Sequence, residues 1–412
     1  MKGKSSNFIA FDIGSSKISA IASHINKQGY AQVNSQILQH SEGFKSGNIV
    51  NMELAENSLI DAIYALEKEC DKSIKEVAIS LSGARVKSYY ISHKIKLGNQ
   101  PISKQDVKKL INKALAEFKV KDQEIIHYFP MEFAIDNEQI VDDPTGMHAH
   151  SLSCQLHIVS ADSLMLLNLT KCLARCHVEV SDIIVSIYAS GIACLSSDEK
   201  EMGSIIVDIG SNTTSFGIFW QGKLAYVSHI PLGGADITID IAKAFSVSMA
   251  TADKLKILFG NANPSLLTKD ATIRLEEFEP ENNYDSDLSI TASQLANIIN
   301  TRMQEIFYQI QTQCNKVSMD HLIAKRMVIT GGAAALPGIK SIAAEMFQKQ
   351  VRIAKPENIP GFAENYNPCM HSSVIGMIKS KSLQYQKNYF KSDRYGETGW
   401  FKRTFVWLRE NI

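Results

Sequence analysis

Two stretches of the chain share one pattern of apolar and polar positions. Residues 8–17 (FIAFDIGSSK) run from an apolar strand pattern through an Asp and a Gly into small polar residues, and residues 17–24 resume the strand pattern. Residues 204–214 (SIIVDIGSNTT) repeat this plan, and strand-like residues follow at 215–220 and 223–229. Gly and small polar residues between two strand-like runs are typical of a β-hairpin turn. Two copies of one hairpin predict a duplicated domain with a site between the copies.

The rest of the chain alternates between helical and strand periodicity, which predicts an α/β fold. We expect helices at residues 54–70, 103–117, 161–175, 183–194, 235–245, 251–258, 291–313 and 339–348, and strands at 76–82, 125–133, 155–160 and 326–330. Ser103 is a suitable N-cap for its helix, with Asp106 in the first turn. The acidic residues 271–287 predict an exposed hairpin or loop. Residues 379–399 are polar and predict a flexible linker.

Composition narrows the class of protein. The chain has 412 residues, enough for two or more domains, and its 43 basic residues balance its 43 acidic residues, so no net charge favours nucleic acid. The seven cysteines are scattered, as expected of reduced thiols in the cytoplasm. Cys172 and Cys176 precede His177, but their spacing fits one helix face better than a metal site. The chain has neither a signal-peptide pattern at its start nor an apolar run long enough to cross a bilayer.

The two hairpin turns carry the chemistry of a phosphate site. Glycine lets the backbone approach an anion, and successive N–H groups and hydroxyls then hold phosphate oxygens. Asp12 and Asp208, at the two strand ends, are carboxylates suited to a hydrated Mg²⁺ between them. Gly331 and Gly332 follow a third strand and precede a helix, where they allow a nucleoside to lie close to the backbone.

These three motifs resemble the phosphate-1, phosphate-2 and adenosine motifs of the actin/Hsp70 superfamily, over most of residues 8–378. Five further segments are similar to the FtsA family of bacterial cell-division proteins: 81–85 (LSGAR), 125–133 (IIHYFPMEF), 143–147 (DPTGM), 168–180 (NLTKCLARCHVEV) and 231–238 (PLGGADIT). The resemblance implies duplicated actin-like, ribonuclease-H-like lobes with an inserted α/β subdomain of the 1C type.

The resemblance also implies a division of the chain. Subdomain 1A takes residues 1–84 and 164–200, subdomain 1C takes 85–163, subdomain 2A takes 201–231 and 305–378, and subdomain 2B takes 232–304. The linker 379–399 and a terminal helix 400–412 complete the chain. The family polymerises through 1C, binds ATP between its large lobes and receives the C-terminal peptide of FtsZ on 2B.

Carried over residue by residue, the family motifs predict three groups of site residues. Those expected to bind ATP are Gly14, Ser15, Ser16, Lys17, Gly210, Asn212, Thr213, Thr214, Asp253, Lys256, Gly331, Gly332 and Ala333. Those expected around Mg²⁺ are Asp12 and Asp208. Arg302 aligns with a basic residue of the family's FtsZ site, and Asn297 lies about one helical turn before it.

Two departures from the family pattern bear on catalysis. Residues 186–190 read SIYAS where relatives often have an acidic residue, and residues 211–215 read SNTTS where an Asp often ends the motif. Ser186 and Ser215 thus replace groups that orient an attacking water. We expect ATP binding with weak ATPase activity at most, and we assign no catalytic residue.

The last 13 residues have a strongly amphipathic pattern. On a helical wheel, one arc holds Trp400, Phe401, Phe405, Trp407, Leu408 and Ile412, while Lys402, Arg403, Arg409 and Glu410 lie opposite. Aromatic and apolar residues flanked by basic ones are typical of a helix that lies in a membrane interface, and FtsA proteins end in such a helix. The alternative is a helix that docks on the protein's own core.

Together these features predict a filament-forming adaptor that tethers FtsZ to the membrane and helps assemble the division machinery. It would be a peripheral protein on the cytoplasmic face of the inner membrane at the septum, with itself, FtsZ, anionic lipid and other division proteins as partners. An actin-like pilus-assembly protein such as PilM remains an alternative, although it needs no amphipathic tail. A kinase or phosphatase of the same superfamily is a second alternative, but no catalytic base beyond the two aspartates is evident.

Overall fold

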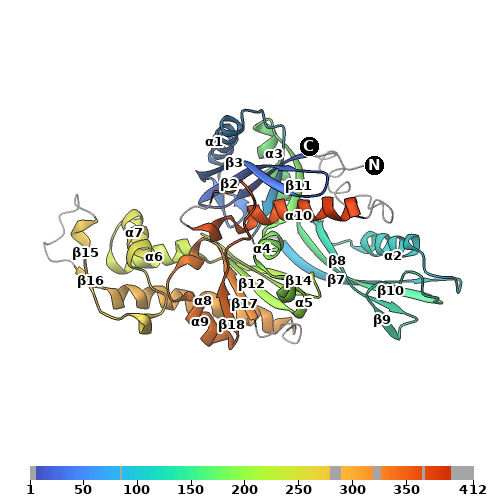
Figure 1. The fold of residues 1–412 in the computed structure, drawn as a ribbon. Helices are drawn as coiled ribbons and strands as arrows, with labels where there is room; N and C mark the ends of the chain where they lie inside the picture. The colour runs from blue at the N-terminus through green and yellow to red at the C-terminus, as the bar shows by residue number, and fades with distance from the viewer. Residues whose placement is uncertain are drawn as a thin grey trace.

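The computed structural model describes residues 6–83, 86–278, 289–317, 319, 326–363 and 367–390. Its ribbon has two lobes, each built on a five-stranded sheet, and a third sheet that projects to one side (Figure 1). None of the described helices has both the length and the apolar character needed to cross a membrane.

The two lobes have the same sheet topology. Lobe 1 has the strand order β11-β6-β1-β2-β3, and lobe 2 has the order β14-β13-β12-β17-β18. In each lobe the first three strands pair antiparallel, as a meander. The first strand also pairs in parallel with a fourth strand, which pairs in parallel with a fifth. The strands are β1 (Ser6–Ile13), β2 (Lys17–Ile25), β3 (Ala31–His40), β6 (Glu76–Leu81) and β11 (Glu179–Val185), then β12 (Ser204–Ile209), β13 (Thr214–Trp220), β14 (Lys223–Ile230), β17 (Arg326–Thr330) and β18 (Gln350–Ile353). The duplication predicted from the two hairpins is therefore confirmed.

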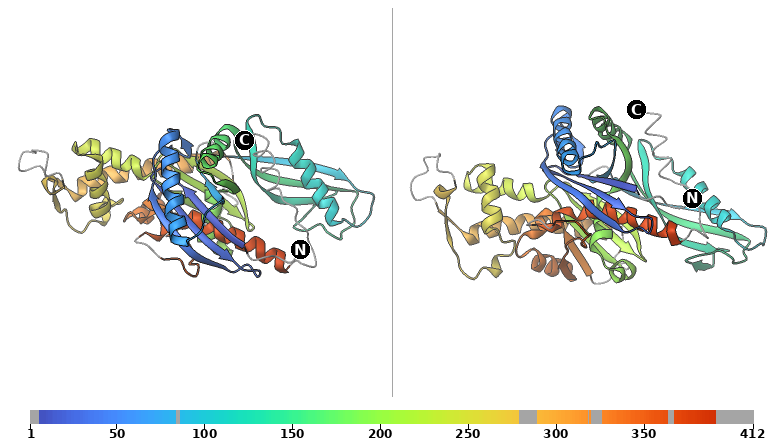
Figure 2. Two further views of the ribbon diagram at one scale, coloured as in Figure 1. Left: turned by 90° about the horizontal axis from the view of Figure 1, so that it is seen from above. Right: turned by 45° about the horizontal axis from the view of Figure 1, so that its top comes forward.

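Helices cover both faces of the lobe 1 sheet (Figures 1 and 2). Helices α1 (Met52–Cys70) and α3 (Ser163–Arg175) lie on one face, and α4 (Ser186–Cys194) and α10 (Ser372–Phe390) lie on the other. Helix α4 also packs on β12 and β13, so it contacts both lobes. Gly376 lets α10 approach α4 closely, because a Cβ at this position would overlap the carbonyl group of Ala189.

The inserted subdomain has its own sheet and core. Its strand order is β7-β10-β8-β9, with β7 (Val86–Lys96), β8 (Gln123–Ile135), β9 (Gln139–Val141) and β10 (Ser151–Asp162), and its helix is α2 (Lys104–Glu117). The predicted cap of α2 is confirmed: Ser103 and Asp106 form a capping box. The inserted α/β subdomain expected between the first two motifs is thus present.

The outer part of lobe 2 is mainly helical. It holds α6 (Gly234–Phe245), α7 (Met249–Phe259) and α8 (Ala292–Lys316), with the small hairpin of β15 (Thr272–Arg274) and β16 (Ser289–Thr291) at its edge. The remaining elements are β4 (Phe44–Lys45), β5 (Asn48–Ile49), α5 (Ser197–Met202), α9 (Ile339–Phe347), η1 (Pro264–Leu266), η2 (Leu275–Glu277), η4 (Gly332–Ala335) and η5 (Pro368–His371).

Two predictions of secondary structure are wrong. The apolar run 183–194 is not one helix: its first residues end strand β11, and α4 begins at Ser186. A short apolar run fits a buried strand as well as a helix, and here parallel pairing with β6 decides the outcome. Residues 379–390 are not a flexible linker, because α10 continues to Phe390. Its polar side chains bond to lobe 1: Lys381 pairs with Asp182 at 2.6 Å, and the Ser382 hydroxyl donates to the carbonyl oxygen of Gly29.

The inserted sheet is bonded to both lobes by buried polar groups. His157 bonds through Nδ1 to the carbonyl oxygen of Leu224 (2.7 Å) and through Nε2 to the hydroxyl of Ser88 (3.0 Å). On the other side, the backbone N–H of Val185 donates to Nε2 of His127 at 3.0 Å. The insertion is therefore bonded to the last strand of the lobe 1 sheet and to β14 of lobe 2.

Burial lowers the pKa of both histidines, to about 4 for His157 and to about 3 for His127, from the ordinary 6.5. Above pH 6.5 both the folded and the unfolded chain carry neutral imidazoles. As the pH falls below 6.5, the unfolded chain binds protons that the folded chain refuses, so each histidine lowers the free energy of unfolding by about 1.4 kcal/mol per pH unit until its folded pKa is reached.

The variant His157→Gln tests this linkage. At pH 7.5 we expect it to be less stable than the wild type, because the substitution disturbs a buried hydrogen-bonded site. Between pH 6.5 and pH 5 the difference should shrink by about 1.4 kcal/mol per unit, since glutamine does not titrate. Urea unfolding at several pH values measures both quantities. A difference that stays constant over this range would contradict the assignment.

Candidate functional site between the two lobes

The two hairpin aspartates occupy equivalent positions in the two lobes. Asp12 pairs with Ser19 one residue before β1 ends, and Asp208 pairs with Ser215 one residue before β12 ends. A serine hydroxyl donates to each carboxylate: Ser80 to Asp12 Oδ1 at 2.5 Å, and Ser190 to Asp208 Oδ2 at 2.7 Å. The repeated topology thus places two similarly held carboxylates on either side of the junction between the lobes.

Lys17 is electrostatically coupled to both aspartates. Burial lowers the pKa of its amine to about 8, and the charges of Asp12 and Asp208 counteract that effect. Burial raises the pKa of Asp208 to about 6, opposed by the Ser190 hydrogen bond and by Lys17 and reinforced by the Asp12 charge. The charge of one amine acts on both carboxylates, while its hydrogen bond goes to the carbonyl oxygen of Met370 (3.3 Å), so a further cation would relieve the repulsion between the carboxylates. The donor set fits Mg²⁺, which takes carboxylate oxygens and water.

The loops that follow the two aspartates are joined by one serine. In the first loop, the N–H of Gly14 donates to the carbonyl oxygen of Lys17 at 2.9 Å, and Ser41 bonds to the carbonyl oxygens of Gly14 and Ser16. Ser46 lies in the turn between β4 and β5, and no sequence motif predicts that it takes part in the site. Its N–H nevertheless donates to Ser15 Oγ (3.0 Å), and its hydroxyl donates to the carbonyl oxygen of Asn212 (3.2 Å).

The second loop is held against the start of α6. The N–H of Gly210 donates to the carbonyl oxygen of Thr213 at 2.9 Å, and the Thr214 hydroxyl donates to the carbonyl oxygen of Leu232 at 2.9 Å. The first N–H group of α6, that of Gly234, donates back to the carbonyl oxygen of Gly210 at 2.9 Å. The loop is therefore fixed from both of its ends.

The third motif adjoins the same place. Gly331 has φ +93°, and a Cβ on it would overlap Asp208 Oδ1. Beyond it, Ala333 lies next to Gly234: a Cβ on that glycine would be 3.4 Å from the Cβ of Ala333. Lys256 reaches this point from α7, bonding to Asp253 (2.6 Å) and to the carbonyl oxygen of Gly234 (3.2 Å). The residues predicted from the three motifs thus converge on one region, although their binding role stays a prediction.

Several residues at the site escape sequence analysis. Ser80 and Ser190 lie singly within a buried strand and a helix, and no local pattern marks them. His371 bonds through Nδ1 to Ser19 at 2.9 Å, and burial with the nearby Lys17 lowers its pKa to about 4. Its chain segment touches both lobes, because the neighbouring Met370 accepts a bond from Lys17 and Cys369 accepts one from the N–H of Gly331.

The two departures from the family pattern meet in space. Ser186 and Ser215 line one small cavity of about 10 Å³, together with Ser82 and His229. The two positions are therefore close in space, and the expectation of weak hydrolysis stays a prediction.

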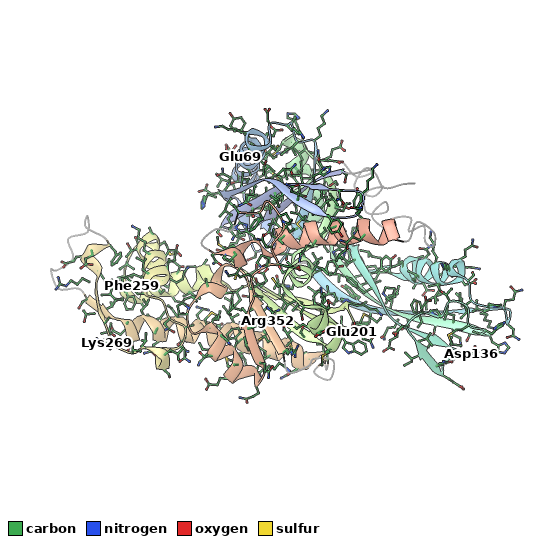
Figure 3. All side chains as sticks on the ribbon, in the orientation of Figure 1. Glu69, Asp136, Glu201, Phe259, Lys269 and Arg352 are labelled. Carbon is green, nitrogen blue, oxygen red and sulfur yellow. The ribbon has the colours of Figure 1, made fainter. Side chains whose placement is uncertain are left out.

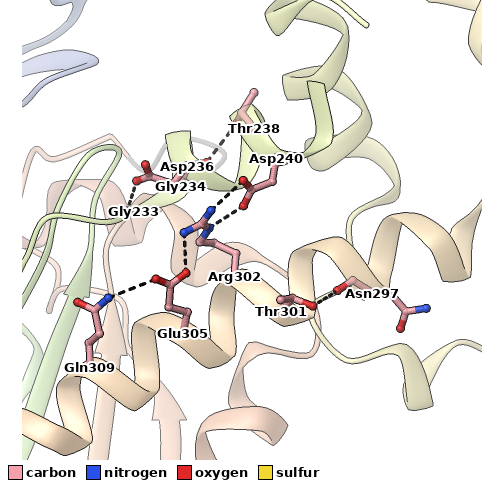
Figure 4. A network of polar contacts seen from close by, with 10 residues as sticks. All are labelled: Gly233, Gly234, Asp236, Thr238, Asp240, Asn297, Thr301, Arg302, Glu305 and Gln309. Carbon is pink, nitrogen blue, oxygen red and sulfur yellow. Dashed lines mark hydrogen bonds and ion pairs between the residues drawn. The ribbon is translucent and has the colours of Figure 1, made fainter. Parts of the chain in front are cut away.

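The predicted partner residues lie on α8, where Arg302 faces α6, the helix that begins at Gly234 (Figure 4). Arg302 forms a two-pronged ion pair with Asp240 of α6, at 2.6 and 2.8 Å, and bonds to Glu305 at 2.6 Å. Asn297 is exposed. The guanidinium of Arg302 is therefore already paired within the protein. A peptide carboxylate would have to bind beside Asp240 or displace it in order to pair with Arg302. The predicted membrane-binding residues 400–412 lie outside the described residues.

Gly331 and Gly332 offer a matched test of the site's geometry. Gly331→Ala places a Cβ against Asp208 on a backbone that side chains rarely adopt, so we expect a loss of about 2 kcal/mol or more in unfolding free energy. Gly332→Ala meets only the flexible Met370 side chain at 3.7 Å and should cost less than about 1 kcal/mol. Urea denaturation of both variants decides, and equal losses would mean that the Gly331–Asp208 contact is not a constraint.

Comparison with known proteins identifies the family. The model of "Cell division protein FtsA" matches residues 205–376, and that of the "SHS2 domain inserted in FTSA" matches residues 83–160, the block expected to be subdomain 1C. The chain is 29% identical to the cell division protein FtsA of Borreliella burgdorferi, with 93% of this chain and 92% of the relative covered. It is 27% identical to that of Rhizobium meliloti (97% and 94% covered) and 26% identical to that of Escherichia coli K12 (98% and 98%).

Solved structures agree on the fold. A chain of the PilM-PilN type IV pilus biogenesis complex superposes with a TM-score of 0.63 at 12% identity, over 94% of this chain and 99% of that one. MreB 5 of Spiroplasma citri bound to AMPPNP gives a TM-score of 0.55 at 13% identity, over 94% and 98%. At such identities these structures speak for the actin-like fold alone. The two family models and the near full-length relatives go further: the chain belongs to the FtsA family of cell division proteins.

Proposed function

We propose that the protein binds Mg·ATP between its lobes and uses that state to form filaments that tether FtsZ to the membrane during cell division. The observation that carries the nucleotide part is the pair Asp12 and Asp208, held by matching serines at equivalent strand ends around Lys17. Duplicated topology with a shared charged centre suits a ligand that needs contacts from both lobes at once.

Different residues would bind the metal, the phosphates and the adenosine of Mg·ATP. Asp12 and Asp208 would hold hydrated Mg²⁺, which supplies positive charge to the phosphate oxygens when bound. Lys17 and the N–H groups and hydroxyls of the two loops would hold the phosphates. Gly332, Ala333 and Lys256 would face the adenosine. The MreB 5 structure bound to AMPPNP shows this fold accepting such a ligand and so supports the proposal.

Calorimetry tests the nucleotide site. Asp208→Ala should weaken Mg·ATP binding at least tenfold, equivalent to about 1.4 kcal/mol, because it removes one of the two carboxylates. The control Asp198→Ala removes an exposed carboxylate from α5 and should bind as the wild type does. Wild-type affinity in Asp208→Ala would overturn the assignment.

The FtsZ part of the proposal concerns α7 and α8. Ile257 and Leu258 of α7 are 70% and 62% exposed, and the neighbouring Gly260 lies against Ile299 of α8. Exposed apolar side chains on α7, together with Arg302 on the neighbouring helix α8, suit a peptide that is both acidic and apolar. The family's own binding of the FtsZ C-terminal peptide on subdomain 2B supports this location.

Two variants distinguish a role of Arg302 in binding the FtsZ peptide from a role in holding α6 to α8. Arg302→Gln should weaken binding of the FtsZ C-terminal peptide several-fold, because it removes the only positive charge of the Arg302, Asp240 and Glu305 group. Asp240→Asn breaks the same ion pair yet leaves the guanidinium charged, so peptide binding should persist or improve. Fluorescence anisotropy measures both. Equal weakening would mean that the pair only holds α6 to α8.

The membrane part rests on the amphipathic pattern of residues 400–412. A single short interfacial helix binds reversibly, and a filament that presents many such helices gains avidity. Polymerisation and membrane attachment would therefore reinforce each other.

Vesicle flotation tests the tail. Trp407→Glu replaces a large aromatic side chain of the apolar arc with a charge and should release the protein from anionic vesicles, while calorimetric Mg·ATP binding is unchanged. Added salt should weaken the wild-type interaction without abolishing it, because only part of it is electrostatic. A chain truncated after Gly399 that still floats would show that the anchor lies elsewhere.

A further inference from the structure

A wide groove opens on lobe 1, far from the site between the lobes. It has a volume of about 1040 Å³ and lies between the ends of α1 and α3, over the first residues of β6 and β11. We refer to it as the α1–α3 groove. Figure 3 labels Glu69, which lies in the last turn of α1 beside it. The groove lies at the amino ends of β6 and β11, whereas Asp12 lies at the carboxyl end of the parallel strand β1.

The groove presents apolar side chains that nothing in the described chain covers. Ile60 and Tyr64 of α1 are 49% and 68% exposed, and Ile63 and Ile74 form the floor beneath them. Adjacent exposed apolar residues on one helix face are unusual unless another segment packs on them. Its volume of about 1040 Å³ is large enough for the apolar side chains of one face of a short amphipathic helix.

The charges around the groove are mainly acidic. Glu67, Glu76 and Glu179 line it, against Lys75 and Arg175, and Arg175 is already paired with Glu56. An occupant with apolar side chains and basic flanks would therefore find complementary charge.

Helix α10 delivers the end of the chain to this edge of lobe 1. Lys381 bonds to Asp182 of β11 at 2.6 Å and lies over the ring of Phe8 of β1, 5.4 Å from its centre. Further along, Tyr385 bonds to Ser6 at 2.6 Å. The strands β1, β6 and β11 are parallel, and Glu76 pairs with Glu179 at their amino ends. Helix α10 thus leaves the sheet at the edge where the groove opens.

The segment beyond α10 has the length and chemistry to reach the groove. Nine residues, 391–399, separate Phe390 from the amphipathic segment and span up to about 30 Å when extended. Passing round a sheet edge from one helix layer to the other needs about two sheet-to-helix spacings of 10 Å. Residues 400–412 then offer six apolar side chains together with Lys402, Arg403 and Arg409.

We propose that residues 400–412 dock in the α1–α3 groove of their own chain when no membrane is present. The docking itself is independent of the proposed function. Its consequence for membrane binding rests on that function. The same apolar arc cannot contact the groove and a bilayer at once. The apparent membrane affinity is therefore the affinity of a free tail multiplied by the fraction of tails that are undocked. Single molecules would stay off the membrane, and anchoring would favour filaments, whose many tails compete more strongly with their grooves.

Cross-linking in lipid-free solution tests the docking. Ser73 is an exposed residue of the groove, and Thr404 lies within the apolar arc of the tail. In a chain with Cys70 and Cys176 replaced by serine, cysteines introduced as Ser73→Cys and Thr404→Cys should form an intramolecular disulfide on mild oxidation, identified by the mass of the linked peptide. The pair Lys269→Cys and Thr404→Cys, with one cysteine in the outer part of lobe 2, is the control and should remain unlinked. Absence of the Ser73 link, or a link only between two chains, would overturn the proposal.

Flotation with anionic phosphatidylglycerol vesicles tests the competition. Tyr64→Glu adds a charge to the groove at an exposed position and should raise the vesicle affinity of the full chain several-fold, because it frees the tail. Leu164→Glu, 62% exposed on α3 outside the groove, is the matched control and should not change it. Unchanged affinity in Tyr64→Glu, alongside a wild-type chain that does float, would overturn the competition. A wild-type chain that never floats would instead contradict the membrane anchor and leave the cross-linking result to decide on docking.

Discussion

Two partly buried carboxylates near the amine of Lys17 are the constraint on which the centre of this molecule depends. Burial raises the pKa of both carboxyl groups, and the charge of Asp12 raises that of Asp208 further. The protein offsets this effect with one serine hydroxyl for each carboxylate and with the amine of Lys17. These groups offset only part of the cost of ionising both carboxylates. A bound cation with phosphate contacts on both lobes would offset the rest. The electrostatics of the lobe junction thus favour a bound cation, which the proposed function supplies as Mg²⁺.

The connections around this centre tie it to distant parts of the fold. The segment from Cys369 to His371 bonds to both lobes beside Lys17 and Gly331, and α10 follows it along the whole lobe 1 sheet. The inserted subdomain is likewise bonded to both lobes, through His127 and His157. A change in the angle between the lobes would therefore be felt at the inserted subdomain and at the end of α10. The family resemblance implies polymerisation through the inserted subdomain, and the proposed function places membrane attachment beyond α10.

The sequence predicts what local patterns encode and misses what packing decides. The duplicated hairpins, Asp12, Asp208 and the turn glycines could be found because each motif is contiguous and occurs in order. Ser80, Ser190 and Ser46 could not, since they become partners only when strands and lobes come together. The same holds for Ile183, whose apolar neighbours fit a helix until pairing with β6 makes them a strand. The polar run at Lys381 looked like a linker because its partner Asp182 lies almost 200 residues earlier in the chain.

The central claim is that one ligand engages both lobes around Asp12 and Asp208. Amide hydrogen exchange with and without Mg·ATP tests it most directly, using peptides that cover residues 8–17, 204–214 and 326–335. The account predicts that Mg·ATP slows exchange in all three segments together, and that Asp208→Ala removes the effect from all three. Protection confined to one lobe, or none at saturating Mg·ATP, would contradict it.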